Sequence, residues 1–187
     1  RNTDEVYLGY SSPKTPSRVY KYNLSNKSKT LVKEQEIPSG HDPENYIVER
    51  VEFKSHDGRL VPLTITRHKK TKTDGSANLL LYGYGSYGNS MSPSFSSTRL
   101  SLIDRNIIWA TAHVRGGMEK GMKWWKEGKL TNKKNTFEDY IYAGKYLIEN
   151  NYTSKGNIIG MGGSAGGLLM GVVVNQSPEL FLGIIMA

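Results

Sequence analysis

The chain has 187 residues, of which 37% are hydrophobic and none is cysteine, and its formal net charge at pH 7 is +8. Without cysteine it can form no disulfide framework, thiolate metal site or thiol nucleophile, which fits a cytoplasmic location. No apolar run approaches the length of about 18 residues that a membrane helix needs, so we expect no membrane partner.

The first 38 residues are predicted to form short amphipathic strands. Aromatic and β-branched residues occur at positions 6–10, 18–22 and 30–33, with turns rich in Ser, Pro, Asn and Lys between them. Three such strands make a poor domain on their own. We therefore assign residues 1–38 to the end of a larger all-β unit, part of a β-propeller.

A polar link at positions 38–43 ends this pattern, and residues 39–187 follow as a second domain. Strands are predicted at 46–53 and 60–67, where Asp57-Gly58 is a hairpin signal. Strands then alternate with helices: strands at 79–82, 107–112, 158–159 and 181–187, and helices at 97–104, 136–150 and from the glycine-rich turn to about 174. This order predicts an α/β fold with a largely parallel sheet.

Lysines recur at nearly helical spacing around Trp124 and Trp125, at positions 120, 123, 126, 129, 133 and 134. Basic residues with aromatics are found in nucleic-acid-binding proteins and on surfaces that bind anionic membranes. No nucleic-acid-binding motif accompanies them. We therefore expect a solvated lysine face, with the tryptophans packed inward or lining a cleft, and no nucleic-acid partner.

The residues that organise the chain are Gly162-Gly163-Ser164-Ala165-Gly166, between a β-branched strand and a small-residue helix. This is the G-x-S-x-G pattern that exposes a nucleophilic serine on a strand–turn–helix corner. The glycines allow a tight turn, and the helix amides point toward the substrate oxygen. We predict that Ser164 is a nucleophile in a partial α/β-hydrolase fold.

A serine nucleophile needs a base and an orienting acid, which follow it in chain order in this fold. All four histidines (His41, His56, His68 and His113) precede Ser164, and Glu179 is the only acidic residue after it. His113 ends a predicted strand near the turn, but we interpret it as a histidine hydrogen-bonded at a strand end. We therefore expect a truncated chain that is inactive alone.

An oxyanion hole can be assembled from residues that are present. One donor is the backbone amide of Ala165, and the other should come from the loop at positions 83–88 after the strand at 79–82. Tyr84 or Tyr87 could supply a phenol O–H there, while the glycines let the loop approach the serine. Core packing is the alternative role for these tyrosines.

Several ordered motifs resemble the prolyl oligopeptidase family of serine peptidases. They lie at positions 80–88, 113–117, 128–130, 133–137, 162–168 and 178–181. The sequences Gly-Ser-Tyr-Gly at 85–88 and Lys-Lys-Asn-Thr-Phe at 133–137 favour the oligopeptidase B branch. Met118 stands where the family's Arg-Gly-Gly-Gly-Glu run has glycine.

The resemblance implies a propeller before the hydrolase domain, no cofactor, Ser164 as nucleophile, and Tyr84 with the Ala165 amide as oxyanion donors. It places Tyr87 at the primary specificity pocket and implies short basic peptides, cleaved after Lys or Arg, as substrates. In the family, the catalytic acid and base follow the serine, and so do the acidic residues that bind the basic side chain of the substrate. A complementary downstream fragment is therefore a candidate partner. A non-catalytic basic binding module and an esterase or lipase on the same fold remain alternatives.

Overall fold

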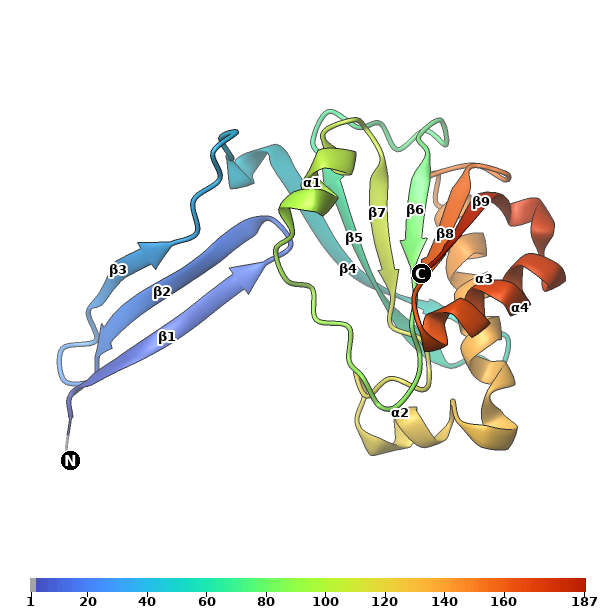
Figure 1. Ribbon diagram of the computed structural model, residues 1–187, viewed down its shortest axis with the longest axis horizontal. Helices are drawn as coiled ribbons and strands as arrows, with labels where there is room; N and C mark the ends of the chain where they lie inside the picture. Colours follow the sequence, from blue (N-terminus) through green and yellow to red (C-terminus); the bar gives the residue numbers. More distant parts are fainter. Residues whose placement is uncertain (1–2) are drawn as a thin grey trace.

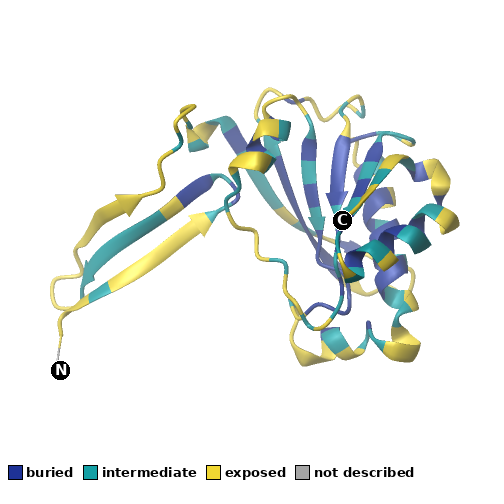
Figure 2. Cartoon of the chain, viewed as in Figure 1, coloured by how far each residue is buried: buried dark blue, intermediate teal, exposed yellow. Residues whose placement is uncertain are grey.

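A computed structural model describes residues 3–187, which form two sheets (Figure 1). The first is antiparallel and contains β1 (Glu5–Ser12), β2 (Thr15–Asn23) and β3 (Lys29–Glu34) in that order. β3 is exposed along its whole length and β1 along most of it, so this sheet has little core of its own (Figure 2). The predicted strands are confirmed, whereas the domain boundary at residue 38 stays a prediction.

The second sheet has six strands in the order β4-β5-β7-β6-β8-β9. Their bounds are β4 (Tyr46–Lys54), β5 (Leu60–His68), β6 (Leu79–Tyr82), β7 (Ile108–Ala112), β8 (Ile158–Gly162) and β9 (Phe181–Met186). β4, β5 and β7 pair antiparallel, and β7, β6, β8 and β9 pair parallel. The predicted hairpin is confirmed, because Lys54 pairs with Leu60 and Gly58 turns the chain at φ +78°.

Helices cover both faces of this sheet (Figure 1). α1 (Ser97–Ile103) packs on β5 and β7, while α3 (Lys134–Glu149) and α4 (Ala165–Gln176) pack against each other and the opposite face. Side chains alternate between the two faces along a strand. Ile108 of β7 accordingly joins the large core under α3 and α4, whereas Trp109 packs with the α1 cluster.

α3 buries the face that its periodicity predicts, including Phe137, Tyr140, Ile141, Gly144 and Leu147. It begins at Lys134, two positions before the predicted start at 136, and α4 extends to Gln176, past the predicted end near 174. Helix ends are the part of a helix that sequence defines least well. Sequence analysis did not predict the short helix α2 (Met122–Lys126) or the 3₁₀ turns η1 (Pro43–Asn45), η2 (Leu130–Asn132) and η3 (Pro178–Leu180).

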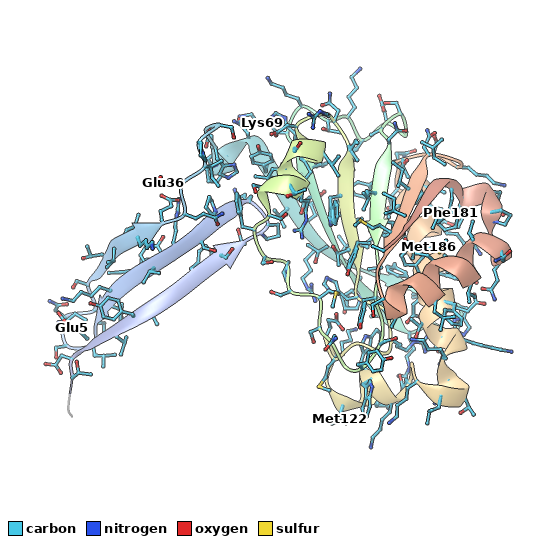
Figure 3. The ribbon with its side chains drawn as sticks, viewed as in Figure 1. Glu5, Glu36, Lys69, Met122, Phe181 and Met186 are labelled. Carbon is cyan, nitrogen blue, oxygen red and sulfur yellow. The ribbon has the colours of Figure 1, made fainter. Side chains whose placement is uncertain are left out.

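β9 forms an apolar edge of the six-stranded sheet. It pairs with β8 on one side, and its side chains Leu182, Ile185 and Met186 are exposed. Phe181 and Met186 mark the two ends of this strand (Figure 3). Unpaired strand edges of this kind promote association with other strands.

Within residues 3–187, no helix combines the length and the apolar character that a membrane crossing requires.

Candidate active site

Ser164 occupies a sharp turn between β8 and α4. Its backbone angles, φ 52° and ψ −119°, match the second residue of a type II′ turn, which the Gly166 amide closes by donating to the Gly163 carbonyl at 2.7 Å. A non-glycine residue in such a conformation costs about 1–3 kcal/mol. The side chain of Ser164 is exposed. The predicted strand–turn–helix geometry is therefore present, while the catalytic role stays a prediction.

The glycines around Ser164 allow three backbone segments to touch. A Cβ on Gly162 would overlap the carbonyl oxygen of Gly166, and a Cβ on Gly166 would lie 2.9 Å from the carbonyl oxygen of Gly83. The end of β8, the first turn of α4 and the loop after β6 are thus in direct contact. Larger residues at these positions would push the segments apart.

This contact places Tyr84 beside the first turn of α4. Tyr84 follows β6 directly, and its Cδ2 lies 3.5 Å from the position that a Cβ on Gly166 would take. Within residues 3–187, no hydrogen bond occupies the Tyr84 hydroxyl or the amide N–H of Ala165. The Ala165 amide is therefore available at the start of α4, while the roles of Tyr84 and Ala165 as oxyanion donors stay predictions.

The loop that carries Tyr84 is held by Lys133, which the sequence analysis wrongly placed on the solvated lysine face and which the structure partly buries. The Lys133 ammonium donates to the carbonyl oxygen of Gly85 at 2.6 Å and to the hydroxyl of Ser86 at 2.9 Å. Burial lowers the pKa of Lys133 below its usual value. Lys133 begins the Lys-Lys-Asn-Thr-Phe run at 133–137, one of the motifs that carry the family resemblance, and this run was the signal in the sequence that could have pointed to its role.

A pocket of about 520 Å³ opens beside Ser164, at the carboxyl edge of the parallel strands. Its walls include Tyr87, Trp125, Lys129, Leu130, Ala165 and Leu168. The predicted specificity residue Tyr87 and the predicted oxyanion residue Ala165 are thus brought to one cavity. Leu130 and Leu168 lie in the motifs at 128–130 and 162–168, but sequence analysis assigned neither leucine a role at the site.

His113 does not serve as a base for Ser164. Its side chain is 1% exposed, with Nε2 2.8 Å from the hydroxyl of Thr64 and Nδ1 3.4 Å from the carboxylate of Glu119. Burial raises the pKa of Glu119, but hydrogen bonds with His113 and the Met91 amide outweigh this effect and lower it. Both ring nitrogens are engaged within the fold, in agreement with the structural role expected for His113.

Behind the site, Arg115 joins three segments in a buried ion-pair network. Its guanidinium pairs with Asp139 of α3 at 2.6 Å and with Asp57 of the β4–β5 hairpin, and it is 1% exposed. Burial lowers the pKa of Arg115, yet the two carboxylates raise it above its usual value. Sequence analysis missed this network, because its members lie far apart along the chain.

The lysine–tryptophan stretch is built into the fold. Trp124 is 5% exposed and donates its indole N–H to the carbonyl of His113 at 3.1 Å, while Trp125 lines the pocket. Lys120 donates to the carbonyl of Leu60 at 2.7 Å. The tryptophans pack inward or line a cleft as expected, and the absence of a nucleic-acid partner stays a prediction.

Between residues 3 and 187, no three or more His, Asp and Glu side chains cluster in a way that would hold a metal ion.

Comparisons with known proteins bear on the family and the fold of this chain. Residues 93–187 match the family model described as the prolyl oligopeptidase family. The chain is 44% identical over 180 residues to dipeptidyl aminopeptidase BI of Pseudoxanthomonas mexicana, covering 96% of this chain and 25% of that protein. It is 41% identical over 180 residues to protease 2 of Moraxella lacunata, covering 96% of this chain and 26% of that protein.

The structure of oligopeptidase B from Leishmania major superposes with a TM-score of 0.90 at 39% identity, covering 99% of this chain and 26% of that one. The α/β-hydrolase fold predicted from the sequence is confirmed in this partial form. The chain spans about a quarter of the length of the curated relatives it matches.

Proposed function

The chain belongs to the prolyl oligopeptidase family, and from this premise we propose that Ser164 is the nucleophile of a serine peptidase that hydrolyses short peptides. The observation that carries the proposal is the backbone of Ser164, held at φ 52° with its side chain exposed at the start of α4. A strained conformation at an exposed nucleophilic residue is characteristic of active sites.

In the proposed reaction, the Ser164 hydroxyl attacks the scissile carbonyl and the resulting oxyanion accepts hydrogen bonds from the Ala165 amide and the Tyr84 hydroxyl. The free state of both donors within the described residues supports these roles. The position of Ala165 at the N-terminus of α4 adds the favourable end of the helix dipole.

The base and the acid are proposed to come from polypeptide outside these 187 residues, on the same chain or on a complementary fragment. The engagement of His113 by Thr64 and Glu119 supports this assignment. Residues 1–187 alone are therefore expected to have little or no peptidase turnover.

Cleavage after Lys or Arg is the finer part of the proposal and rests on the likeness to protease 2 and oligopeptidase B. The described walls of the pocket carry Lys129 and Lys133 and no carboxylate. The acidic groups that bind a basic substrate side chain would therefore also come from outside the described residues. A cytoplasmic location belongs to the same proposal.

The test uses the protein that carries this chain, purified at its natural length and treated with a fluorophosphonate probe. We expect covalent labelling at Ser164 that is lost in Ser164→Ala, and cleavage of the amide bond in arginyl peptide substrates, which distinguishes a peptidase from an esterase or lipase. In Tyr84→Phe we expect turnover to fall by about 10²–10³, as for loss of one oxyanion donor. Undiminished labelling in Ser164→Ala, or a Tyr84→Phe enzyme with full turnover, would refute the assignment.

A further inference from the structure

The loop that follows β6 is fixed at both ends by backbone hydrogen bonds. The amide of Gly83 donates to the carbonyl of Met161 in β8 at 3.1 Å, and the amide of Gly88 donates to the carbonyl of Gly116 at 3.0 Å. Between these two anchors, and within residues 3–187, the side chain of Lys133 is the only group from another part of the chain that forms a hydrogen bond with the loop. The conformation of the loop between its anchors therefore depends on Lys133.

Lys133 reaches this loop at a closely packed point. Its ammonium donates to the carbonyl oxygen of Gly85 at 2.6 Å and to the hydroxyl of Ser86 at 2.9 Å. Gly85 is buried at φ +66°, and a Cβ there would overlap the side chains of Thr136 and Val114. Within the described residues the Gly85 carbonyl has no other donor, so removal of the ammonium would leave a buried polar group without a partner.

The charge of Lys133 lies where the fold gains little from it. Lys133 is the N-cap of α3, the end of a helix at which a cation is unfavourable, and the first turn of α3 contains no acidic residue. Burial lowers the pKa of Lys133, and within residues 3–187 its ammonium forms no ion pair. The centroid of the Phe137 ring lies 6.0 Å from the ammonium, at the outer limit of a cation–π contact. A residue that opposes local preferences in this way indicates a role in function.

We propose that Lys133 is a positioning residue for the oxyanion hole: by holding the Gly85 carbonyl, it keeps the Tyr84 hydroxyl where the oxyanion forms. This inference rests on the proposed function, in which Ser164 attacks the substrate and Tyr84 donates to the oxyanion. Tyr84 directly precedes Gly85, so a shift of the Gly85 peptide also moves the donor. A donor stabilises the oxyanion only within about 2.7–3.1 Å of it, so a small shift of the loop is enough to lose the interaction.

The test compares Lys133→Met with Lys134→Met in the protein at its natural length, using whichever of an arginyl and a prolyl fluorogenic peptide the unmodified protein cleaves faster. Methionine keeps most of the length of lysine but donates no hydrogen bond. For Lys133→Met we expect kcat to fall about 10- to 100-fold, less than for complete loss of an oxyanion donor, and KM to change by less than about threefold. Lys134, exposed at the start of α3, should tolerate the change. An unchanged kcat in Lys133→Met, or an equal fall in Lys134→Met, would overturn the proposal.

A double-mutant cycle with Tyr84→Phe separates positioning from a purely structural role. If Lys133 acts through the Tyr84 hydroxyl, Lys133→Met should lower kcat by less than about threefold in the Tyr84→Phe background, because the donor is already absent. A structural role alone would lower kcat by the same factor in both backgrounds, which would overturn the proposal. If circular dichroism shows that Lys133→Met does not fold, Ser86→Ala removes one of the two hydrogen bonds instead; its kcat should fall about three- to tenfold, again only when the Tyr84 hydroxyl is present.

The fluorophosphonate probe distinguishes failure of this inference from failure of the proposed function. Labelling of Ser164 together with equal falls in kcat in both backgrounds would keep the peptidase and refute the positioning role of Lys133. A protein whose Ser164 resists the probe would refute the proposed function and this inference with it.

Discussion

Replacing Ser164 with glycine should stabilise the fold relative to replacing it with alanine. Both variants remove the hydroxyl, which has no hydrogen bond within the described residues, so they differ in their response to the φ of 52°. Alanine retains the strain of about 1–3 kcal/mol, and glycine relieves it. Glycine loses about 0.5–1 kcal/mol more in conformational entropy on folding. The net expectation is that Ser164→Gly exceeds Ser164→Ala by roughly 0–2.5 kcal/mol in free energy of unfolding.

Urea unfolding followed by circular dichroism measures this difference at the protein's natural length. The matched control is Ser101, an exposed position within α1, where alanine should be more stable than glycine by about 1 kcal/mol. The order of the two substitutions should therefore reverse between the turn and the helix. If Ser164→Ala is more stable than Ser164→Gly, as at Ser101, the turn at Ser164 is not strained and the argument for its role loses its basis.

Four further predictions concern packing, charge and the sheet edge. Gly162→Ala should lower stability by about 1–3 kcal/mol because its Cβ would overlap the Gly166 backbone, whereas Gly171→Ala, with open space around it, should raise the melting temperature. Asp139→Asn should cost about 3–5 kcal/mol by leaving a buried guanidinium short of countercharge, measured by urea unfolding. Burial raises the pKa of Asp57, but the hydrogen bonds from that guanidinium and the Arg59 amide, together with the charge of the guanidinium, outweigh this and lower the pKa. The stabilisation from Asp57 is therefore present above a pH of about 4 and lost as the pH falls further, and Asp57→Asn should flatten this loss when unfolding is measured against pH. Residues 1–187 expressed alone should self-associate in sedimentation velocity, less so with Leu182→Lys on the exposed edge of β9.

The elements of the fold could be predicted wherever local periodicity determines them. β6 has the predicted bounds 79–82, and α3 buries the predicted face, because an apolar strand and an amphipathic helix are each defined by neighbouring residues. α2 was not predicted as an element, since five residues are too few to show helical periodicity. The contact between Arg115 and Asp139 depends on how β7 and α3 pack, which no local pattern contains.

The residues of the candidate site likewise fall into those that the local sequence determines and those that tertiary packing determines. Gly162, Ser164 and Gly166 could be identified because the steric demands of one tight turn act within five residues. The wall formed by Leu130 could not, because its φ of 51° follows from how the chain between α2 and α3 packs and not from its own residue type. A leucine in that position contradicts local turn preference, and such contradictions occur mainly where function selects the residue.

The arrangement of the strands also argues against His113 as the base in the proposed reaction. His113 follows β7 and Ser164 follows β8, and β6 lies between these strands, which corresponds to a separation of about 10 Å at the usual strand spacing. A general base must come within about 3 Å of the hydroxyl whose proton it takes. His113 is buried and bonded on both sides of its ring, so moving it would break its contacts with Glu119 and Thr64. The exposed face of Ser164 is thus the side from which a base can approach.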